Sequence, residues 1–262
     1  MKKFIIILYI LTLNLIASNI QINGIYNIEY GSFLPLGTAD AKLIIDEKNN
    51  YELSISAQTT GLVKVLSNNR SEEYKSLGKI INGQFIPEKF IKIKKDNVKE
   101  RIREYTINKI DKKIYVDDYT EIKSKFYDSK LNVKYKTLKA QNNYILDYFA
   151  KDDILSLFFN LKEKFSKFKQ NIDYKLKALG ANKTKGIINI FIPKDKKEIN
   201  KYLNTKSNMK FIAYINQKIF QSERGELLIS INKKGFCDYA VLKDVLLFGD
   251  IKGELVSLKV TN

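Results

Sequence analysis

The chain has 262 residues, with 46 Lys and Arg against 29 Asp and Glu, and a formal net charge of +17 at pH 7. It contains 44% hydrophobic residues, one cysteine and no histidine. Without histidine the chain lacks the commonest general base and the commonest transition-metal ligand. We therefore expect a folded protein with no cofactor, no metal site and no catalytic residue, rather than an enzyme.

The positive charge comes almost entirely from lysine, because only 4 of the 46 basic residues are arginine. Specific recognition of phosphates and bases depends on the planar guanidinium group of arginine. Lys, Ile and Asn are abundant together, which is more typical of a drift in codon composition than of selection for binding a polyanion. We therefore expect no nucleic acid partner.

Residues 1–17 have the features of a cleavable signal peptide. Lys2 and Lys3 precede an apolar run over 4–16, which is shorter than the about 20 residues that a spanning helix needs. Small residues at Ala17 and Ser18 predict cleavage after Ala17; a retained anchor is the alternative. We expect residues 18–262 to form a single β-rich domain in the periplasm, with no transmembrane segment in the mature chain.

The first part of the mature chain alternates apolar and polar residues, as half-buried strands do. Residues 24–34, 39–45 and 51–57 predict three strands of an antiparallel meander. Thr60 and Gly61 interrupt the alternation, and the apolar residues 62–66 are expected to plug one end of a curved sheet.

Two turn signals connect the next three predicted strands, 71–81, 84–95 and 98–107. Asn82-Gly83 is a strong signal for a two-residue hairpin, and Asp96-Asn97 is a weaker one. If both turns have two residues, Tyr74, Ile91 and Ile102 line one face of the sheet. The opposite face then gathers basic residues, as a solvated face or as a wall for anionic headgroups or another polyanion: Lys75, Lys92, Lys94, Lys99, Arg101 and Arg103.

The rest of the chain predicts further strands and one or two helices. The clearest helix covers 152–161, with Asp152 as its N-cap and an apolar stripe for the core. Residues 195–203 predict a short polar helix or a loop. Strands are expected over 113–116, 119–127, 131–138, 173–179, 186–192, 209–215, 226–232, 238–248 and 253–260.

These elements predict a mostly β protein with one large curved antiparallel sheet, which forms an open half-barrel. Its concave face is the candidate ligand site, and small inward residues such as Ala57 leave room for a cavity or for close packing. The candidate lining residues are Tyr51, Leu53, Ile55, Ala57, Leu62, Leu66, Ile91 and Ile102. The adjacent carboxylate pairs 117–118 and 152–153 are expected in turns or caps, because neighbouring residues do not face one another.

Several short motifs are spread over nearly the whole mature chain. They are YNIEYG (26–31), LGTA (36–39), Tyr51 with AQTTGL (57–62), NGQFIP (82–87), DILSL (153–157) and FGDIKGEL (248–255). Together they resemble the DUF3108 family of exported bacterial proteins, although the family's later proline is replaced here by residues 238–241. The resemblance implies a periplasmic half-barrel, similar in outline to lipoprotein-carrier folds. The family has no established activity, so no site residue is carried over.

Two classes of function follow from these observations. The first is a non-catalytic periplasmic protein that binds a hydrophobic or amphipathic molecule of the cell envelope, such as a lipid, in the half-barrel. The alternative is a structural or interaction protein that docks an envelope protein through the basic sheet face, Lys92 to Arg103, or through an edge strand. An enzyme that acts through carboxylates alone is a more distant third class.

Overall fold

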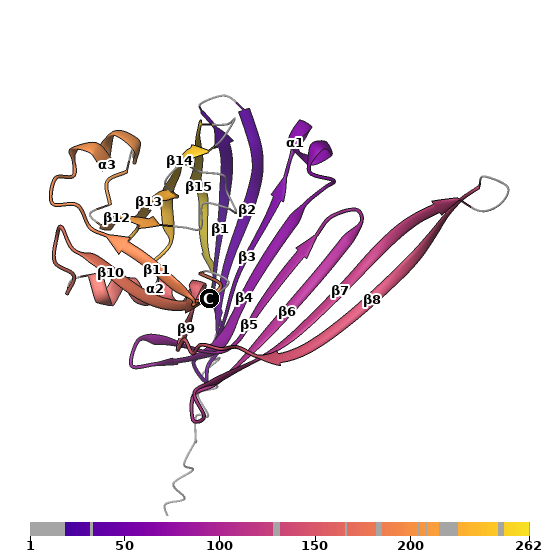
Figure 1. Cartoon of the computed structure of the whole chain (residues 1–262). Coiled ribbons are helices and arrows are strands. Elements are labelled where there is room, and N and C mark those ends of the chain that lie inside the picture. The colour runs from indigo at the N-terminus through magenta and orange to yellow at the C-terminus, as the bar shows by residue number, and fades with distance from the viewer. Residues whose placement is uncertain are drawn as a thin grey trace, which may run out of the picture.

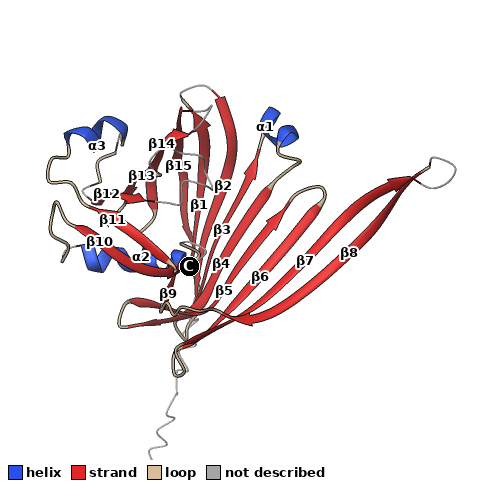
Figure 2. Cartoon of the chain, in the orientation of Figure 1, coloured by secondary structure: helices blue, strands red, loops and turns tan. Residues whose placement is uncertain are grey.

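A computed structural model describes most of the chain and shows one large curved sheet with three short helices (Figures 1 and 2). The prediction of a mostly β protein with an open antiparallel sheet is thereby confirmed. The predicted signal peptide lies outside the described residues. The described residues are 19–31, 34–127, 132–165, 167–181, 185–203, 205–207, 209–214, 225–245 and 249–261.

Within these residues the sheet has 15 strands, and its two chain ends meet where β1 pairs with β15. All pairs of neighbours are antiparallel except the two-residue contact between β9 and β10. On one side of the β1–β15 pair the sheet runs from β1 to β8 in ascending order. Its strands are β1 (Ile20–Tyr30), β2 (Leu34–Ile45), β3 (Asn50–Thr59), β4 (Ser71–Ile81), β5 (Gln84–Lys95), β6 (Lys99–Asn108), β7 (Lys113–Tyr127) and β8 (Val133–Ile145).

The other side of the β1–β15 pair runs from β15 to β9 in descending order. Its strands are β15 (Gly249–Thr261), β14 (Cys237–Val245), β13 (Glu226–Ile231), β12 (Met209–Tyr214), β11 (Ile187–Phe191), β10 (Asp173–Leu179) and β9 (Asp152–Asp153). The helices are α1 (Gly61–Leu66), α2 (Ile154–Phe165) and α3 (Lys197–Tyr202). In the described part of the chain, no helix is both long and apolar enough to cross a membrane.

The sheet curls around α2, which is apolar on two sides. On one side Leu155 and Phe159 belong to a core cluster with Tyr51, Leu53 and Phe90. On the other side Phe158, Leu161 and Phe165 pack with side chains of the second half of the sheet, Ile190, Phe211 and Ile231. Burial of each large apolar side chain contributes about 1.5–3 kcal/mol to the stability of the fold. Because α2 buries such side chains in both clusters, it holds the two halves of the sheet together. We call the face of β1–β8 that packs on α2 the inner face, and the opposite one the outer face.

The Asn82-Gly83 hairpin is a two-residue turn, as predicted, with φ of 51° and 77° at its two residues. The register then shifts by one residue at a bulge between Leu77 and Gly78. A Cβ at Gly78 would lie 2.1 Å from the carbonyl oxygen of Ile86, so only glycine fits this close approach of the two backbones.

The prediction that Ile91 and Ile102 share a face with Tyr74 is wrong. Beyond the bulge Tyr74 pairs with Lys92, which puts Ile91 on the outer face. The next turn holds four residues rather than two, because Lys95 pairs with Glu100 and Asp96 Oδ1 accepts bonds from the Val98 and Lys99 amides, both at 2.8 Å. Ile102 also lies on the outer face, since an odd shift in register reverses the face of every later residue.

The expected plug at 62–66 is also wrong for the residues whose side chains are described. These residues form α1, beyond the ends of β3 and β4 (Figure 1), where Val65 and Leu66 are 70% and 75% exposed. Both side chains are thus largely exposed to solvent, so Leu66 does not line the concave face. The side chain of Leu62 lies outside the described part.

Asn160 attaches α2 to the sheet, because its side-chain amide bonds to the backbone of Phe85 as a neighbouring strand would. Its Oδ1 accepts a bond of 2.8 Å from the Phe85 amide, and its Nδ2 donates to the Phe85 carbonyl at 2.9 Å. The same Nδ2 donates to Asp152 Oδ1 at 3.2 Å. A buried side-chain amide thus satisfies both backbone groups of Phe85.

Replacement of Asn160 by alanine is expected to lower the free energy of unfolding by about 2–4 kcal/mol, because both backbone groups of Phe85 lose their partner. Urea unfolding followed by circular dichroism measures the change. Lys162→Ala, at an exposed position of the same helix, is the matched control and should change stability by less than about 0.5 kcal/mol. Similar effects of the two substitutions would contradict the anchoring role.

Candidate functional site

The inner face of β3–β8 consists of cross-strand rows that change from apolar to charged along the strands. The lower row is Leu53, Ser76, Phe90, Tyr105, Val116 and Tyr144. The middle row is Ile55, Tyr74, Lys92, Arg103, Asp118 and Asn142. The upper row is Ala57, Glu72, Lys94, Arg101, Thr120 and Ala140. We call the middle and upper rows together the inner basic surface.

The base of the half-barrel is filled with side chains. Leu53 and Tyr51 are each 3% exposed and Phe90 is fully buried, so these residues belong to the core under α2. Of the expected lining residues, Ile55 and Ala57 lie higher on the inner face, where Ile55 is 36% exposed. A ligand on this face would therefore lie over Ile55 and its row rather than inside the base.

Asp118 holds two arginines of the inner basic surface in place. Arg101 Nε donates to Asp118 Oδ1 at 2.7 Å, and Arg103 Nε donates to Oδ2 at 2.8 Å. The Arg101 guanidinium also reaches the second oxygen, which makes a bidentate pair. Burial would raise the pKa of Asp118, but the bonds from the two guanidinium groups outweigh it and lower the pKa below its usual value.

Glu72, on β4, has a similar role three strands further from the β8 edge than Asp118. It accepts bonds from Lys94 Nζ at 2.8 Å and from the Tyr74 hydroxyl at 2.6 Å, and it also pairs with Arg70. Burial would raise the pKa of Glu72, but these three donors lower it to about 2. Lys92 Nζ lies 5.0 Å from the centre of the Tyr74 ring, in cation–π contact.

Of the six residues predicted for a basic face, Lys75 lies on the outer face beside Ile91. The other five share the inner face: Lys92, Lys94, Arg101 and Arg103 in the middle and upper rows, and Lys99 beside Ile122 at the start of β6. The expectation that they lie opposite Tyr74 is wrong, because the bulge at Gly78 brings Lys92 directly beside it. Their mutual repulsion is reduced by Glu72 and Asp118. Four cations against two carboxylates leave the inner basic surface with a net charge of +2.

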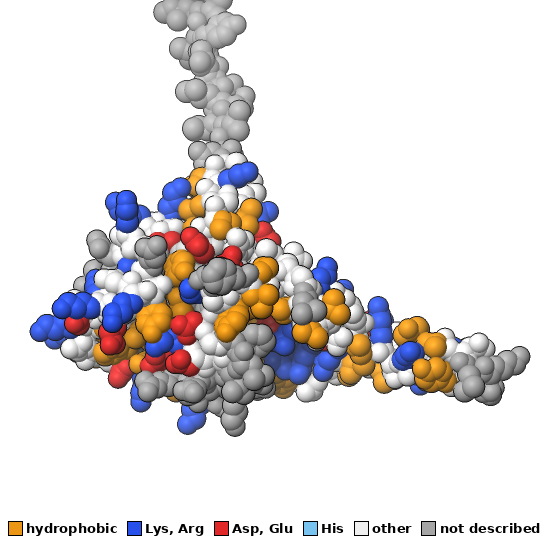
Figure 3. All heavy atoms as spheres, turned by 90° about the horizontal axis from the view of Figure 1, so that it is seen from above, with side chains coloured by type: hydrophobic (Ala, Val, Ile, Leu, Met, Phe, Trp, Pro, Cys, Tyr) orange, Lys and Arg blue, Asp and Glu red, His pale blue; other side chains and the backbone are white. Residues whose placement is uncertain are grey.

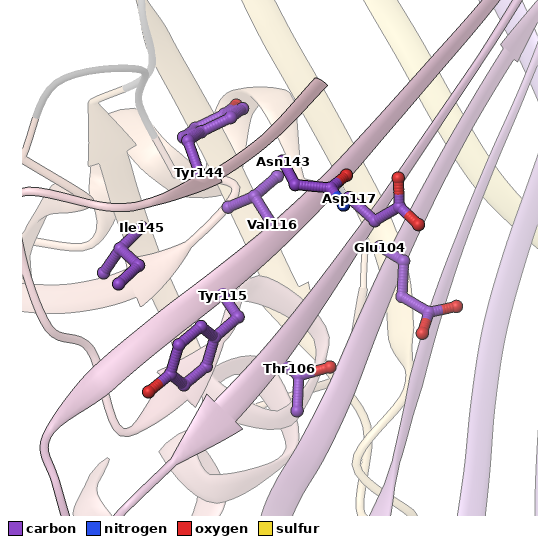
Figure 4. A pocket seen from close by; sticks show the side chains of 8 residues that line it. All are labelled: Glu104, Thr106, Tyr115, Val116, Asp117, Asn143, Tyr144 and Ile145. Atoms are coloured by element: carbon purple, nitrogen blue, oxygen red, sulfur yellow. The ribbon is translucent and has the colours of Figure 1, made fainter. Parts of the chain in front are cut away.

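The outer face carries a shallow hollow that the sequence did not reveal (Figure 4). It has a volume of about 350 Å³, and Glu104 and Asp117 lie directly opposite each other in it. Lys89 pairs with Glu104, and Gln141 Nε2 lies 3.1 and 3.2 Å from the two oxygens of Asp117. Both carboxylates therefore have partners within the sheet. The hollow is lined by Glu104, Thr106, Tyr115, Val116, Asp117, Asn143, Tyr144 and Ile145.

A second open hollow of about 410 Å³ lies between the start of α2 and β10. Lysines surround it, and one of them, Lys164, lies 3.6 Å from Asp152. Among the described residues, no group of three or more His, Cys, Asp or Glu side chains is arranged to hold a metal ion.

A buried carboxylate, Asp153, connects α2 to the lower row. Its Oδ1 caps the helix by accepting bonds from the amides of Leu155 and Ser156 at 2.8 and 2.9 Å. Its Oδ2 accepts a bond from Ser76, whose hydroxyl lies 3.0 Å from that of Tyr51. The predicted N-cap, Asp152, is one residue too early, because α2 begins at Ile154 and the amides of its first turn donate to Asp153.

Comparisons with known proteins place the chain in no established family. No family model matches it, and no curated protein matches it; the resemblance to the DUF3108 family is therefore not supported. Among solved structures, it is similar to a β-barrel-like protein with the domain of unknown function DUF1849 from Brucella abortus, with a TM-score of 0.41 and 11% sequence identity. The match covers 94% of this chain and 100% of that chain. Such a likeness carries no argument about function.

The buried position of Asp153 predicts a specific dependence of stability on pH. Burial raises its pKa from 3.8 to about 6, against the opposing effect of its hydrogen bonds. The folded chain then binds this proton more tightly than the unfolded chain. The resulting stability is fully present below about pH 4 and is lost as the pH rises through 6, by about 3 kcal/mol in total.

Asp153→Asn removes this titration and keeps an oxygen for the helix cap. Urea unfolding of both proteins between pH 3.5 and 7.5 should show the wild type losing stability relative to the variant as the pH rises, mainly between about pH 4 and 6. A difference that stays constant over this range would refute the raised pKa of Asp153.

Proposed function

We propose that the protein is a non-catalytic binding protein that holds an anionic amphiphile on the inner basic surface. The observation that supports this most is the placement of Lys92, Lys94, Arg101 and Arg103 beside Ile55 and Tyr74 on one curved face. Apolar contact area next to a few cationic groups is the combination that an amphiphile requires.

The chemistry of the two rows favours an anionic headgroup. The surface has a net charge of +2, and its two arginines present planar donors suited to a carboxylate or a phosphate. Arg101 and Arg103 are already oriented by Asp118, so a ligand would meet pre-positioned groups at a lower entropic cost. Because the base of the half-barrel is filled, the apolar part of the ligand would lie along Ile55 and Tyr74.

This proposal includes export and the lack of catalysis. The basic and apolar residues 2–16 support transport to the periplasm, where amphiphiles of the envelope are abundant. The absence of histidine from the sequence, and the internal partners of Glu104 and Asp117, support binding rather than turnover. No cofactor is part of the proposal.

A second candidate is docking of a protein partner by strand addition to β8. Every residue of β8, Val133–Ile145, is exposed, and in the described sheet β8 is an edge strand with β7 as its neighbour. An extended peptide can add to such an edge through backbone hydrogen bonds. A stoichiometric envelope protein recovered with the purified chain would favour this second candidate.

Binding of a fluorescent long-chain fatty acid, compared with its uncharged methyl ester, tests the proposed function. The double variant Lys92→Gln/Lys94→Gln should weaken binding of the acid about tenfold, at ~0.7 kcal/mol for each charge. The matched control is Lys75→Gln/Lys89→Gln, which removes the same charge from the outer face and should leave binding unchanged. A wild type that binds no acid, or two double variants with equal effects, would contradict the proposal.

A further inference from the structure

The hairpin of β7 and β8 continues as a free arm beyond the rest of the sheet (Figure 1). The last residue of β7 that pairs with β6 is Ile122, and the last backbone bond to the neighbouring turn runs from the Lys123 amide to the Val98 carbonyl at 2.8 Å. Five further pairs follow, from Lys123 with Thr137 to Tyr127 with Val133. We call these ten residues the arm; at about 3.3 Å per residue it extends about 17 Å.

The arm combines lysine with exposed aromatic side chains. Its ten residues include four lysines, no acidic residue and no arginine, which gives a net charge of +4. Tyr127 is 60% exposed, Tyr135 is 71% exposed and Phe126 is 43% exposed. Figure 3 shows the arm leaving the body with hydrophobic and basic side chains interspersed along it.

Both faces of the arm have this composition. The face that continues the inner face carries Phe126 with Lys134 and Lys136. The opposite face carries Tyr127 and Tyr135 with Lys123 and Lys125, and Lys125 Nζ lies 5.5 Å from the centre of the Tyr127 ring. A flat interface with another protein needs aromatic and basic side chains on only one face of the arm. A partner that surrounds the arm needs them on both faces.

We propose that the arm docks the protein on an anionic lipid surface. Phe126, Tyr127 and Tyr135 enter the layer between headgroups and hydrocarbon, where aromatic side chains concentrate, and the lysines contact lipid phosphates. The headgroup layer is about 5–8 Å thick on each side of a bilayer, so an arm of this length reaches across it. Lysine suits this role because its flexible stem lies along apolar surface while its ammonium group remains in the polar layer.

Two other partners fit the arm less well. Pairing of the arm with a β-strand of another chain is disfavoured because Lys134 and Lys136 lie on the arm's part of β8, and lysine on an edge strand opposes such pairing; the candidate of strand addition to β8 then concerns its lysine-free residues 140–145. Nucleic acid recognition draws on arginine, which the arm lacks. The arm lies beyond the middle and upper rows, so this inference does not rest on the proposed amphiphile binding.

Cosedimentation with lipid vesicles at low salt tests the inference on the chain as cells produce it. The vesicles contain about one third phosphatidylglycerol in phosphatidylcholine, or phosphatidylcholine alone. All proteins share one N-terminus, so any contribution of residues 1–18 is the same in every comparison. The wild type should bind the anionic vesicles and lose this binding with phosphatidylcholine alone or at high salt.

Two arm variants separate charge from aromatic contact. Lys123→Gln/Lys136→Gln should weaken vesicle binding about 30-fold, which corresponds to ~1 kcal/mol for each lysine near an anionic surface. Tyr127→Ser/Tyr135→Ser should weaken it about tenfold or more through lost apolar contact. Lys233→Gln/Lys234→Gln, at an exposed turn between β13 and β14, removes the same charge and should bind as the wild type does.

Three results would overturn the inference. The first is a wild type that does not bind anionic vesicles, and the second is arm variants that bind as well as the wild type. The third is loss of vesicle binding in Lys92→Gln/Lys94→Gln with retention in both arm variants, which would assign the contact to the inner basic surface. A wild type that binds anionic vesicles but does not bind the fatty acid would refute the proposed function alone and leave this inference standing.

Discussion

The hydrogen bond between Ser76 on β4 and the buried carboxylate of Asp153 is the contact on which the rest of the structure depends. Asp153 also caps α2, so one side chain sets both where the helix begins and where it meets the sheet. Asn160 adds a second attachment two turns later, at the backbone of Phe85. With α2 fixed in this position, its two apolar sides hold the two halves of one sheet around a common core.

This arrangement explains why the inner face has two different parts. Near α2 the lower row is buried except for Tyr144 on the edge strand, and Phe90 and Tyr105 belong to the core. Further along the same strands the helix no longer covers the sheet, and charged residues occupy the inward positions. The bulge at Gly78 decides which residues these are, because without it Ile91 rather than Lys92 would face inward. A one-residue bulge, in which Glu88 on β5 is the extra residue beside Gly78, thus determines the charge of the candidate site.

The sequence predicted most strands, α2 and the Asn82-Gly83 turn, because alternation and turn chemistry are local signals. It did not predict the bulge at Gly78, since the close approach to Ile86 arises only when the strands pair. It split β7 into two strands at Asp117-Asp118, although Asp118 is buried between Arg101 and Arg103 on the neighbouring strand. The sequence also predicts the helix cap at Asp152 rather than Asp153, because the contact that distinguishes the two is not local. Ser76, which donates to Asp153, lies 77 residues away in the chain.

A double-mutant cycle of Ser76→Ala and Asp153→Ala, measured by urea unfolding at pH 8, tests the central claim that this contact locks α2 into the sheet. A hydrogen bond to a buried ionised carboxylate predicts a coupling free energy of about 1–3 kcal/mol between the two residues. A coupling below about 0.3 kcal/mol, with the two single effects simply additive, would contradict the account.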